Sequence, residues 1–324
     1  KMSKDRKLSV IVPCYNEEEV IETCYSRIAD VFKDIDYTLE LIFINDGSAD
    51  KTAELIHKIC ENDKRVVFID LSRNFGKEAA MSAGIDMMSG DAAIILDADL
   101  QDPPEIIPQF IALWEQGYDN IYGVRTERDG ESWFKKMTAT YFYRILKRMS
   151  FVDIPRNAGD FRLLSRRAID AIRKLPERQR FMKGLFAWIG FNTIAVKYKR
   201  QARVAGSTKW NYWNLWNFAI EGITSFSTLP LRLASYIGIL ISFLSFIYAV
   251  FIFIRTLIYG VGVDGYASQM VVILFLGGLQ LLFLGIMGEY LGRVFNETKD
   301  RPLYMTKNII NLPDCAKIFD QQGR

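Results

Sequence analysis

Short apolar runs alternate with amphipathic segments through the first hundred residues. The apolar runs are typical of buried strands, and they lie within 8–16, 39–52, 66–72 and 92–99. Intervening segments such as 17–35 and 77–89 have the pattern of surface helices. Strands that alternate with helices at this interval predict an α/β fold, with a mostly parallel sheet covered by helices on both faces.

Polar residues follow three of the predicted strands, in the turns Pro13–Glu17, Asp46–Ser48 and Asp97–Gln101. In an open parallel sheet, ligands bind outside the carboxyl ends of the strands. We therefore expect the three turns to meet along one rim of the sheet and to form one site. Either Ser48 or Asp50 is suited to cap the helix that follows the second turn.

The second half of the chain contains two long segments without charge, 233–254 and 270–288. As helices they would measure about 33 Å and about 28 Å, enough to cross the core of a bilayer. The alternative is a pair of long helices buried in a soluble core. The connecting loop, 255–269, carries one basic residue, whereas the outer flanks carry Lys209, Arg232, Arg293, Lys299, Arg301 and Lys307. This asymmetry predicts that both termini and the first domain lie in the cytoplasm.

Two further segments have an interfacial pattern. The stretch 133–150 separates apolar and aromatic residues from basic ones at helical spacing, which suits a helix lying on an anionic membrane. A helix that packs on the domain with a solvated basic face fits the same pattern. The stretch 210–218 holds three tryptophans just before the first apolar segment, where the headgroup layer would lie.

Composition excludes several classes of function. A formal net charge of +3 is too small to indicate a nucleic-acid partner. The four cysteines form no CxxC pair, so we expect reduced thiols. The single histidine, His57, lies in a predicted surface helix, which argues against a histidine base or a histidine-rich zinc site.

The turn "LDADLQDPPE" (96–105) concentrates carboxylates at the end of a predicted buried strand. Asp97 and Asp99 are hard oxygen ligands of the kind that Mg²⁺ or Mn²⁺ prefers when a substrate diphosphate shares the ion. Gln101 adds a neutral oxygen. The alternative, carboxylates that cap the next helix, suits Asp102 before Pro103 better than it suits the first two acids.

Several longer motifs carry a resemblance: "VPCYNEEE", "FINDGSADKT", "SRNFGKEAAMSAGID", "DADLQDPPE", "NAGDFRLLSR", "ERQRFMKGLFAWIG" and "AGSTKWNYWNLWNFAIEGITSFSTLPLR". Together they resemble the family 2 glycosyltransferases with a GT-A fold, and among these the bactoprenol (undecaprenyl-phosphate) glucosyltransferases, relatives of dolichyl-phosphate mannose synthase. The resemblance covers nearly the whole chain. The organisation it implies is a cytoplasmic catalytic domain (1–210), interfacial helices (211–232), two membrane helices with a short external loop (233–290) and a cytoplasmic tail (291–324).

The resemblance also implies a role for each matching position. Nucleotide-sugar binding is implied for Pro13, Tyr15, Glu17, Asp46, Asp97, Arg203 and Lys209. Binding of Mg²⁺ or Mn²⁺ is implied for Asp97, Asp99 and Gln101. The lipid phosphate is expected at Arg125, with Lys135, Lys136 and Arg162 as further basic residues. Catalytic roles fall to Asp99, Arg125 and Asp160, the last as a base. Taken singly, Glu17 also suits a helix-start charge, and Arg203 a surface base.

The expected acceptor has little need of a catalytic base to deprotonate it. A polyprenyl phosphate has a second pKa of about 6, so it is mostly dianionic at neutral pH and already nucleophilic. Its difficulty is to approach an anionic sugar diphosphate, which cations relieve. Asp160 would then orient Arg162 or the sugar hydroxyls. Direct displacement would invert the anomeric centre, giving a β-linked product from an α-linked donor.

Rival functions remain open from sequence alone. A processive polysaccharide synthase would carry a QxxRW motif, which is missing here. A non-catalytic sugar-nucleotide-binding protein would be expected to have lost part of the acidic turn, and a transporter would need polar residues within its spans. Glucose from UDP-glucose is the donor implied by resemblance, with N-acetylglucosamine, galactose or GDP-mannose as alternatives. Resemblance also implies a homo-oligomer, a tetramer, in a bacterial plasma membrane.

Overall fold

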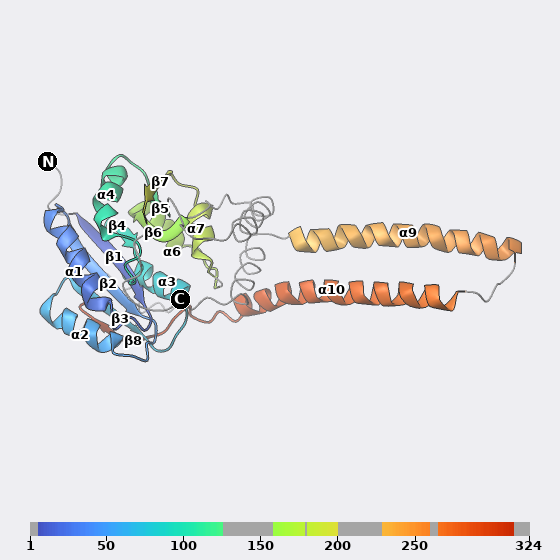
Figure 1. The fold of residues 1–324 in the computed structure, drawn as a ribbon, viewed down its shortest axis with the longest axis horizontal. Helices are drawn as coiled ribbons and strands as arrows, with labels where there is room; N and C mark the ends of the chain where they lie inside the picture. The colour runs from blue at the N-terminus through green and yellow to red at the C-terminus, as the bar shows by residue number, and fades with distance from the viewer. Residues whose placement is uncertain (1–5, 126–157, 179, 200–228, 260–264, 314–324) are drawn as a thin grey trace.

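A computed structural model describes residues 6–125, 158–178, 180–199, 229–259 and 265–313. Its centre is an eight-stranded sheet with the order β7-β5-β6-β4-β1-β2-β3-β8 (Figure 1). The strands are β1 Lys7–Cys14, β2 Thr38–Asn45, β3 Val66–Leu71, β4 Ala92–Ile95, β5 Asn120–Arg125, β6 Ala158–Ser165, β7 Thr193–Tyr198 and β8 Thr306–Ile310. Strands β4, β1, β2 and β3 run parallel, as predicted, whereas β6 and β8 are antiparallel to their neighbours β4 and β3.

Helices cover both faces of this sheet, which confirms the predicted α/β class. The helical segments are α1 Ile21–Val31, η1 Phe32–Asp34, α2 Thr52–Asn62, α3 Lys77–Met87, η2 Pro104–Ile106, α4 Ile107–Glu115, α6 Arg166–Arg173, α7 Met182–Trp188, α9 Leu229–Tyr259 and α10 Tyr266–Thr298. Apolar residues of α1, α2 and α4 form one core with the sheet, and those of α3, α6 and α7 form the other. The central strands read as continuous apolar runs because both of their faces are buried.

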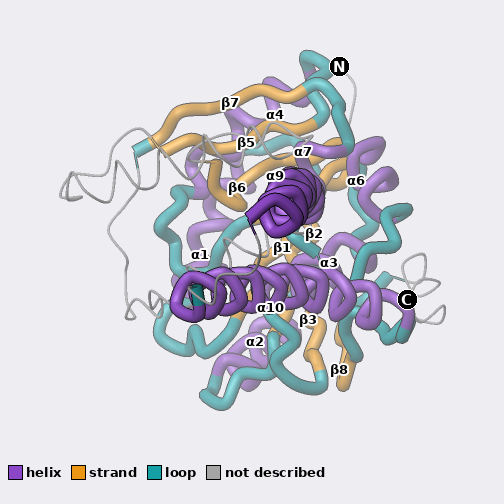
Figure 2. Tube along the Cα trace, turned by 90° about the vertical axis from the view of Figure 1, so that its right-hand side faces the viewer, coloured by secondary structure: helices purple, strands orange, loops and turns teal. Residues whose placement is uncertain are grey.

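Helices α9 and α10 extend away from the sheet domain (Figures 1 and 2). They contain the predicted segments 233–254 and 270–288 and continue beyond them at both ends. Two stretches, Leu233–Tyr259 and Val271–Thr298, are long and apolar enough to cross a membrane, and neither is buried within the chain. The alternative of helices buried in a soluble core is therefore wrong. An exposed apolar surface of this size needs an apolar environment outside the chain to cover it.

The residues after α10 depart from the predicted tail. Strand β8 returns to the sheet and pairs antiparallel with β3, with Asn308 opposite Asp70. Asn311 then donates through Nδ2 to the carbonyls of Cys60 and Val66, at 3.0 Å each. Residues 306–311 therefore belong structurally to the sheet domain, and β8 covers what would otherwise be the open edge of β3. The predicted interfacial segments 133–150 and 210–218 lie outside the described residues.

Candidate active site

The loops that follow β1 and β2 are held together by hydrogen bonds in both directions. The backbone N–H of Asn16 donates to Ser48 Oγ at 2.9 Å, and the N–H of Ala49 donates back to Asn16 Oδ1 at 2.9 Å. Asn16 has a left-handed backbone, φ +55°, which asparagine tolerates better than most residues. The first two predicted turns thus form one surface at the carboxyl ends of the central strands.

Neither Ser48 nor Asp50 is the N-cap of α2, because the residue before the helix is Lys51 and it makes no side-chain cap hydrogen bond. Asp50 instead binds the first residue of the helix. Its Oδ1 accepts from the backbone N–H of Thr52 at 3.1 Å and from the Thr52 hydroxyl at 2.6 Å. The Thr52 hydroxyl oxygen in turn accepts from the backbone N–H of Glu17 at 2.8 Å. The start of α2 is therefore tied to the loop after β1, which fixes where Glu17 stands on the rim.

Pro13 is accommodated inside a central strand because its neighbour has already ended. The carbonyl of Ile11 accepts from Leu96 N–H, so this side of β1 faces β4, and alternate residues of a strand face the same side. Pairing of β1 with β4 stops at Ile95, opposite Ile11. The N–H that Pro13 lacks would therefore point past the end of β4, where no ladder partner is needed. Tyr15 follows on the same rim and is exposed.

Asp46 holds a neighbouring loop in place. Its two carboxylate oxygens accept from the backbone N–H groups of Phe75 and Gly76, at 2.7 and 3.0 Å. Burial raises the pKa of Asp46, and these two hydrogen bonds act against the rise. The next residue must be glycine, because at Gly47 (φ +65°) a Cβ would lie 2.5 Å from the backbone of Arg73. The polar group expected near the nucleotide thus also anchors the loop that leads into α3.

The acidic turn after β4 contains a strained residue. Leu100 has φ +53°, a left-handed conformation that is uncommon for a bulky side chain, and the side chain is fully buried. The turn is closed by a hydrogen bond from the N–H of Gln101 to Asp99 Oδ1 at 3.2 Å. Strain of this kind persists only where surrounding packing enforces it, and it is frequent at functional sites. Here it places the Asp99 carboxylate and the Gln101 side chain on one tight turn.

A lysine stands between the acids of two different strands. Lys77 Nζ, on the first residue of α3, lies 2.6 Å from Asp97 Oδ1 and 2.6 Å from Asp160 Oδ2. Lys183 Nζ approaches the other oxygen of Asp160 at 3.9 Å. Burial alone would lower the pKa of Lys77, but the two carboxylates outweigh it and raise the pKa above its ordinary value. Burial would raise the pKa of Asp160, and the two lysines instead hold it below its usual range.

Arg162 lies beneath this cluster. It is 3% exposed, its guanidinium stacks 3.8 Å from the centroid of Phe186, and one nitrogen donates to the Gly159 carbonyl at 2.9 Å. Burial lowers the pKa of Arg162 to about 10, while the charge of Asp160 acts to raise it. A side chain at this depth stabilises the charge of Asp160 from below, and it does not face the open rim.

The expected Asp102 helix cap does not form, since η2 has no side-chain cap. Asp102 is buried and accepts a hydrogen bond from the hydroxyl of Tyr198, on β7. The side chain therefore ties the end of the acidic turn to the far side of the sheet. This contact lies between residues almost a hundred positions apart, so local sequence could not reveal it.

Comparison with known families is decisive at this point. The family model described as glycosyl transferase family 2 matches residues 9–173, which hold the central strands and every acid described above. The chain belongs to glycosyl transferase family 2. A second model, described as the GtrB C-terminal hairpin, matches residues 229–294 of this glycosyltransferase, the region of α9 and most of α10.

Relatives of this glycosyltransferase match along almost their whole length. An uncharacterised glycosyltransferase of Synechocystis sp. is 51% identical over 94% of this chain and 96% of its own. The bactoprenol glucosyl transferase of Shigella phage SfV is 47% identical over 93% of this chain and 98% of its own. A crystal structure of glucosyl-3-phosphoglycerate synthase from Mycobacterium tuberculosis covers 68% of this chain and 78% of its own at 20% identity, with a TM-score of 0.46. A likeness that distant carries no argument about ligands.

The oxygen donors of this glycosyltransferase fit a divalent cation that is shared with a substrate. Among the described residues, no group of three or more acids, histidines or cysteines is arranged to enclose a metal by itself. Asp97 and Asp99 supply two carboxylates, and Gln101 Oε1 is buried with no hydrogen-bond partner. Magnesium is usually held by one or two carboxylates together with substrate phosphates, so an incomplete protein site is what such chemistry requires.

The structure places the predicted residues of the glycosyltransferase site in three groups. On or beside the rim are Pro13, Tyr15, Glu17, Asp46, Asp97, Asp99, Gln101 and Asp160, with Arg162 buried behind it. Arg125 ends β5, which runs in the same direction as β4 because both are antiparallel to β6, so its backbone reaches the same rim. Lys135, Lys136, Arg203 and Lys209 lie outside the described residues.

Sequence reasoning missed Lys77, Glu78 and Lys183. The first two lie in the quoted motif "SRNFGKEAAMSAGID", where charges directly at a helix start were the available signal. Glu78 is half-buried, and burial together with the charge of Asp160 raises its pKa to about 7. Its Oε2 accepts from the backbone N–H of Met182 at 3.2 Å, which ties α3 to the start of α7.

Proposed function

We propose that this glycosyltransferase moves a hexose, glucose first among the candidates, from a UDP-sugar to undecaprenyl (polyprenyl) phosphate at the cytoplasmic face of a bacterial membrane. The observation that carries the proposal is an incomplete oxygen site, Asp97, Asp99 and Gln101, in a chain that also bears an exposed apolar hairpin. Relatives that are 46–47% identical over 93% of the chain are named bactoprenol glucosyl transferases.

The residues divide the work by charge. Asp97, Asp99 and Gln101 would hold Mg²⁺ or Mn²⁺, which supplies positive charge to the donor diphosphate when bound. The loops after β1 and β2, with Tyr15 and Glu17, would receive the nucleotide, and Asp46 keeps the adjoining loop in shape. The remaining basic residues are assigned by resemblance: Arg203 and Lys209 to the diphosphate, and Arg125, Lys135 and Lys136 to the acceptor phosphate.

The surroundings of Asp160 favour a positioning role over that of a base. The carboxylate is kept ionised by Lys77 and Lys183, with Arg162 behind it. A carboxylate with a depressed pKa is a weak base, and a dianionic lipid phosphate scarcely needs one. Direct attack of that phosphate on the anomeric carbon would give inversion, with UDP as the leaving group.

The hairpin supports action at a membrane surface. A lipid phosphate stays at the bilayer, so an enzyme that uses it gains from an anchor that keeps the rim near the headgroups. The basic flanks of the two apolar stretches favour the cytoplasmic side for the catalytic domain. We further propose a homo-oligomer, a tetramer as the resemblance implies, which mass measurement of the detergent-solubilised protein would test.

A donor screen tests the function. Purified full-length protein in detergent is mixed with undecaprenyl phosphate, Mn²⁺ or Mg²⁺, and a panel of UDP- and GDP-sugars, and the lipid product is read by mass. We expect a metal-dependent glucosyl lipid from UDP-glucose, and none from the Asp99→Asn variant. Product from another donor alone would change the sugar, and no product from any donor, with UDP still bound, would favour a non-catalytic binding protein.

A further inference from the structure

Lys77 stands between two acids that come from different strands of the sheet, Asp97 and Asp160. Its Nζ is 2.6 Å from a carboxylate oxygen of Asp97, after β4, and 2.6 Å from one of Asp160, at the start of β6. The lysine reaches this point because it begins α3, directly after the loop that Asp46 anchors through Phe75 and Gly76. The Lys77 ammonium is therefore a fixed part of the candidate active site and is placed there by the fold.

The lysine is nevertheless able to leave. Its side chain is 41% exposed, that of Asp97 is 27% exposed, and that of Asp160 is 15% exposed. A lysine ammonium is a point charge on a flexible stem, so it can exchange partners without moving the backbone. If Lys77 swings away, Asp160 retains the neighbouring charge of Lys183, whereas Asp97 becomes available to another cation.

We propose that Lys77 is a resident countercation that makes metal binding depend on the sugar nucleotide. A divalent ion arriving alone must displace the ammonium from Asp97 and leave it with only one of its two carboxylates, that of Asp160. An ion arriving with a nucleoside diphosphate brings a second anionic partner, because the ammonium can turn from Asp97 to a diphosphate oxygen. The inference rests on the proposed function in one respect, namely that the ligand is a metal-chelating nucleoside diphosphate.

The charge balance gives the sign of the effect. Asp97, Asp99 and Asp160 contribute three negative charges at the rim, and Lys77 neutralises one of them at contact distance. Removal of the lysine increases the attraction for a dication, because charges at contact distance interact appreciably even when solvent screens them in part. Removal of Lys77 also takes away the ammonium that would pair with a diphosphate oxygen. Metal alone should therefore bind more tightly, and coupling between metal and nucleotide should shrink.

The test measures Mn²⁺ binding without turnover. Full-length protein in detergent is titrated with Mn²⁺, free ion is read by electron paramagnetic resonance, and the titration is repeated with saturating UDP. In the wild type we expect weak binding of Mn²⁺ alone and a large gain with UDP. In Lys77→Met we expect Mn²⁺ alone to bind at least about tenfold more tightly and the gain from UDP to fall by a similar factor. Unchanged or weaker binding of Mn²⁺ alone would overturn the inference.

Two further variants separate charge from folding and from the proposed function. Lys77→Arg keeps the positive charge and should retain the wild-type pattern, so tighter Mn²⁺ binding in this variant would also overturn the inference. Lys183→Met removes a cation at 3.9 Å from Asp160 only, and should change Mn²⁺ affinity less than Lys77→Met. A wild type that binds neither UDP nor Mn²⁺ would overturn the proposed function and this inference together. Normal coupling in the wild type with no gain in Lys77→Met would overturn this inference alone.

Discussion

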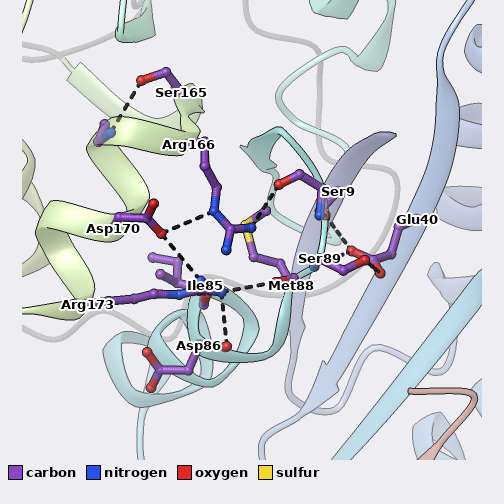
Figure 3. A network of polar contacts seen from close by, with 12 residues as sticks. Ser9, Glu40, Ile85, Asp86, Met88, Ser89, Ser165, Arg166, Asp170 and Arg173 are labelled. Carbon is purple, nitrogen blue, oxygen red and sulfur yellow. Dashed lines mark hydrogen bonds and ion pairs between the residues drawn. The ribbon is translucent and has the colours of Figure 1, made fainter. Parts of the chain in front are cut away.

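The two ends of the central sheet carry similar residues but use them differently. At the amino ends of β1, β2 and β4, Glu40 is 3% exposed and accepts from the hydroxyl of Ser9 and the backbone N–H of Ser89, the latter at 2.9 Å (Figure 3). At the carboxyl ends, Asp97 is 27% exposed and pairs with the movable ammonium of Lys77. The Glu40 carboxylate is held at contact distance by two serine side chains and a backbone N–H, with Lys7 farther away at 3.7 Å, whereas the Asp97 carboxylate is held by the exposed ammonium of Lys77.

The basic residues show the same contrast. At the amino end, Arg173 donates to the carbonyls of Ile85, Asp86 and Met88 at 2.6–3.0 Å, and so satisfies the last turn of α3 (Figure 3). At the opposite end of the same helix, Lys77 holds only side-chain carboxylates. Helix α3 is therefore fixed at its end and adaptable at its start. A polar network closed by backbone groups stabilises the fold, whereas one closed by flexible side chains can receive a ligand.

The largest expected effect is a loss of turnover when an acid at the carboxyl ends of the strands is replaced. Asp99→Asn should lower turnover on the order of a thousandfold, about 4 kcal/mol, because a proposed ligand of the metal loses its charge. Asp160→Asn should cost about tenfold or less, since a dianionic acceptor needs little help from a base. Steady-state kinetics with the lipid acceptor would measure both, and thermal unfolding of Asp99→Asn should show little change. Equal losses in the two variants, with nucleotide binding intact in Asp160→Asn, would contradict the ranking.

A substitution at the amino ends of the strands should lower the stability of the fold and leave turnover unchanged. Glu40→Ala leaves the Ser9 hydroxyl and the Ser89 N–H buried without their acceptor, at a cost of about 2–4 kcal/mol in the free energy of unfolding. Denaturant unfolding would measure the loss, and turnover per folded molecule should stay near that of the wild type. Glu61→Ala is a matched control, since this acid is exposed and pairs only loosely with His57. A normal unfolding midpoint in Glu40→Ala would remove the contrast between the two ends.

Glu78 sharpens the comparison through pH. Burial raises the pKa of Glu78 from its ordinary value of 4.5 to about 7, so between these values the folded state binds a proton that the unfolded state has released. Stability from this group is therefore present below pH 4.5 and falls as pH rises toward 7, by about 3 kcal/mol in total. Glu78→Gln keeps an acceptor for Met182 N–H and should flatten that decline. Unfolding curves of both proteins at pH 5 and pH 8 would measure this decline. If Glu78→Gln loses as much stability between the two pH values as the wild type does, Glu78 is not the cause of the decline.

The smallest expected effect concerns the returning strand β8. Asn311→Gly should cost about 1–2 kcal/mol by removing the hydrogen bonds to Cys60 and Val66. Asn311→Ala should cost about 1 kcal/mol more, because the position has φ +58° and alanine resists that conformation. Thermal unfolding of the catalytic domain is the readout. Identical midpoints for both variants and the wild type would mean that the segment after α10 does not stabilise the sheet.

Most of the fold was open to prediction because its signals are local. A strand buried on both faces is a continuous apolar run, and the four central strands were found within a few residues, although β4 ends at Ile95 rather than at 99. Strand β8 was missed because a five-residue stretch with two isoleucines does not differ from loop in sequence. Its partner strand lies more than 230 residues earlier, and only the unpaired edge of β3 explains the pairing.

By itself, the sequence determined the α/β class, the acidic rim and the apolar hairpin, because each depends on residues that are neighbours along the chain. Tertiary structure alone decided which cation stands between Asp97 and Asp160, and that Asp46 holds a loop. Lys77 and Asp160 are separated by 83 positions, and no periodicity or motif encodes a contact at that distance. Such pairs arise because packing of the whole sheet brings strand ends together. Charged side chains then form ion pairs with the opposite charges that lie within reach.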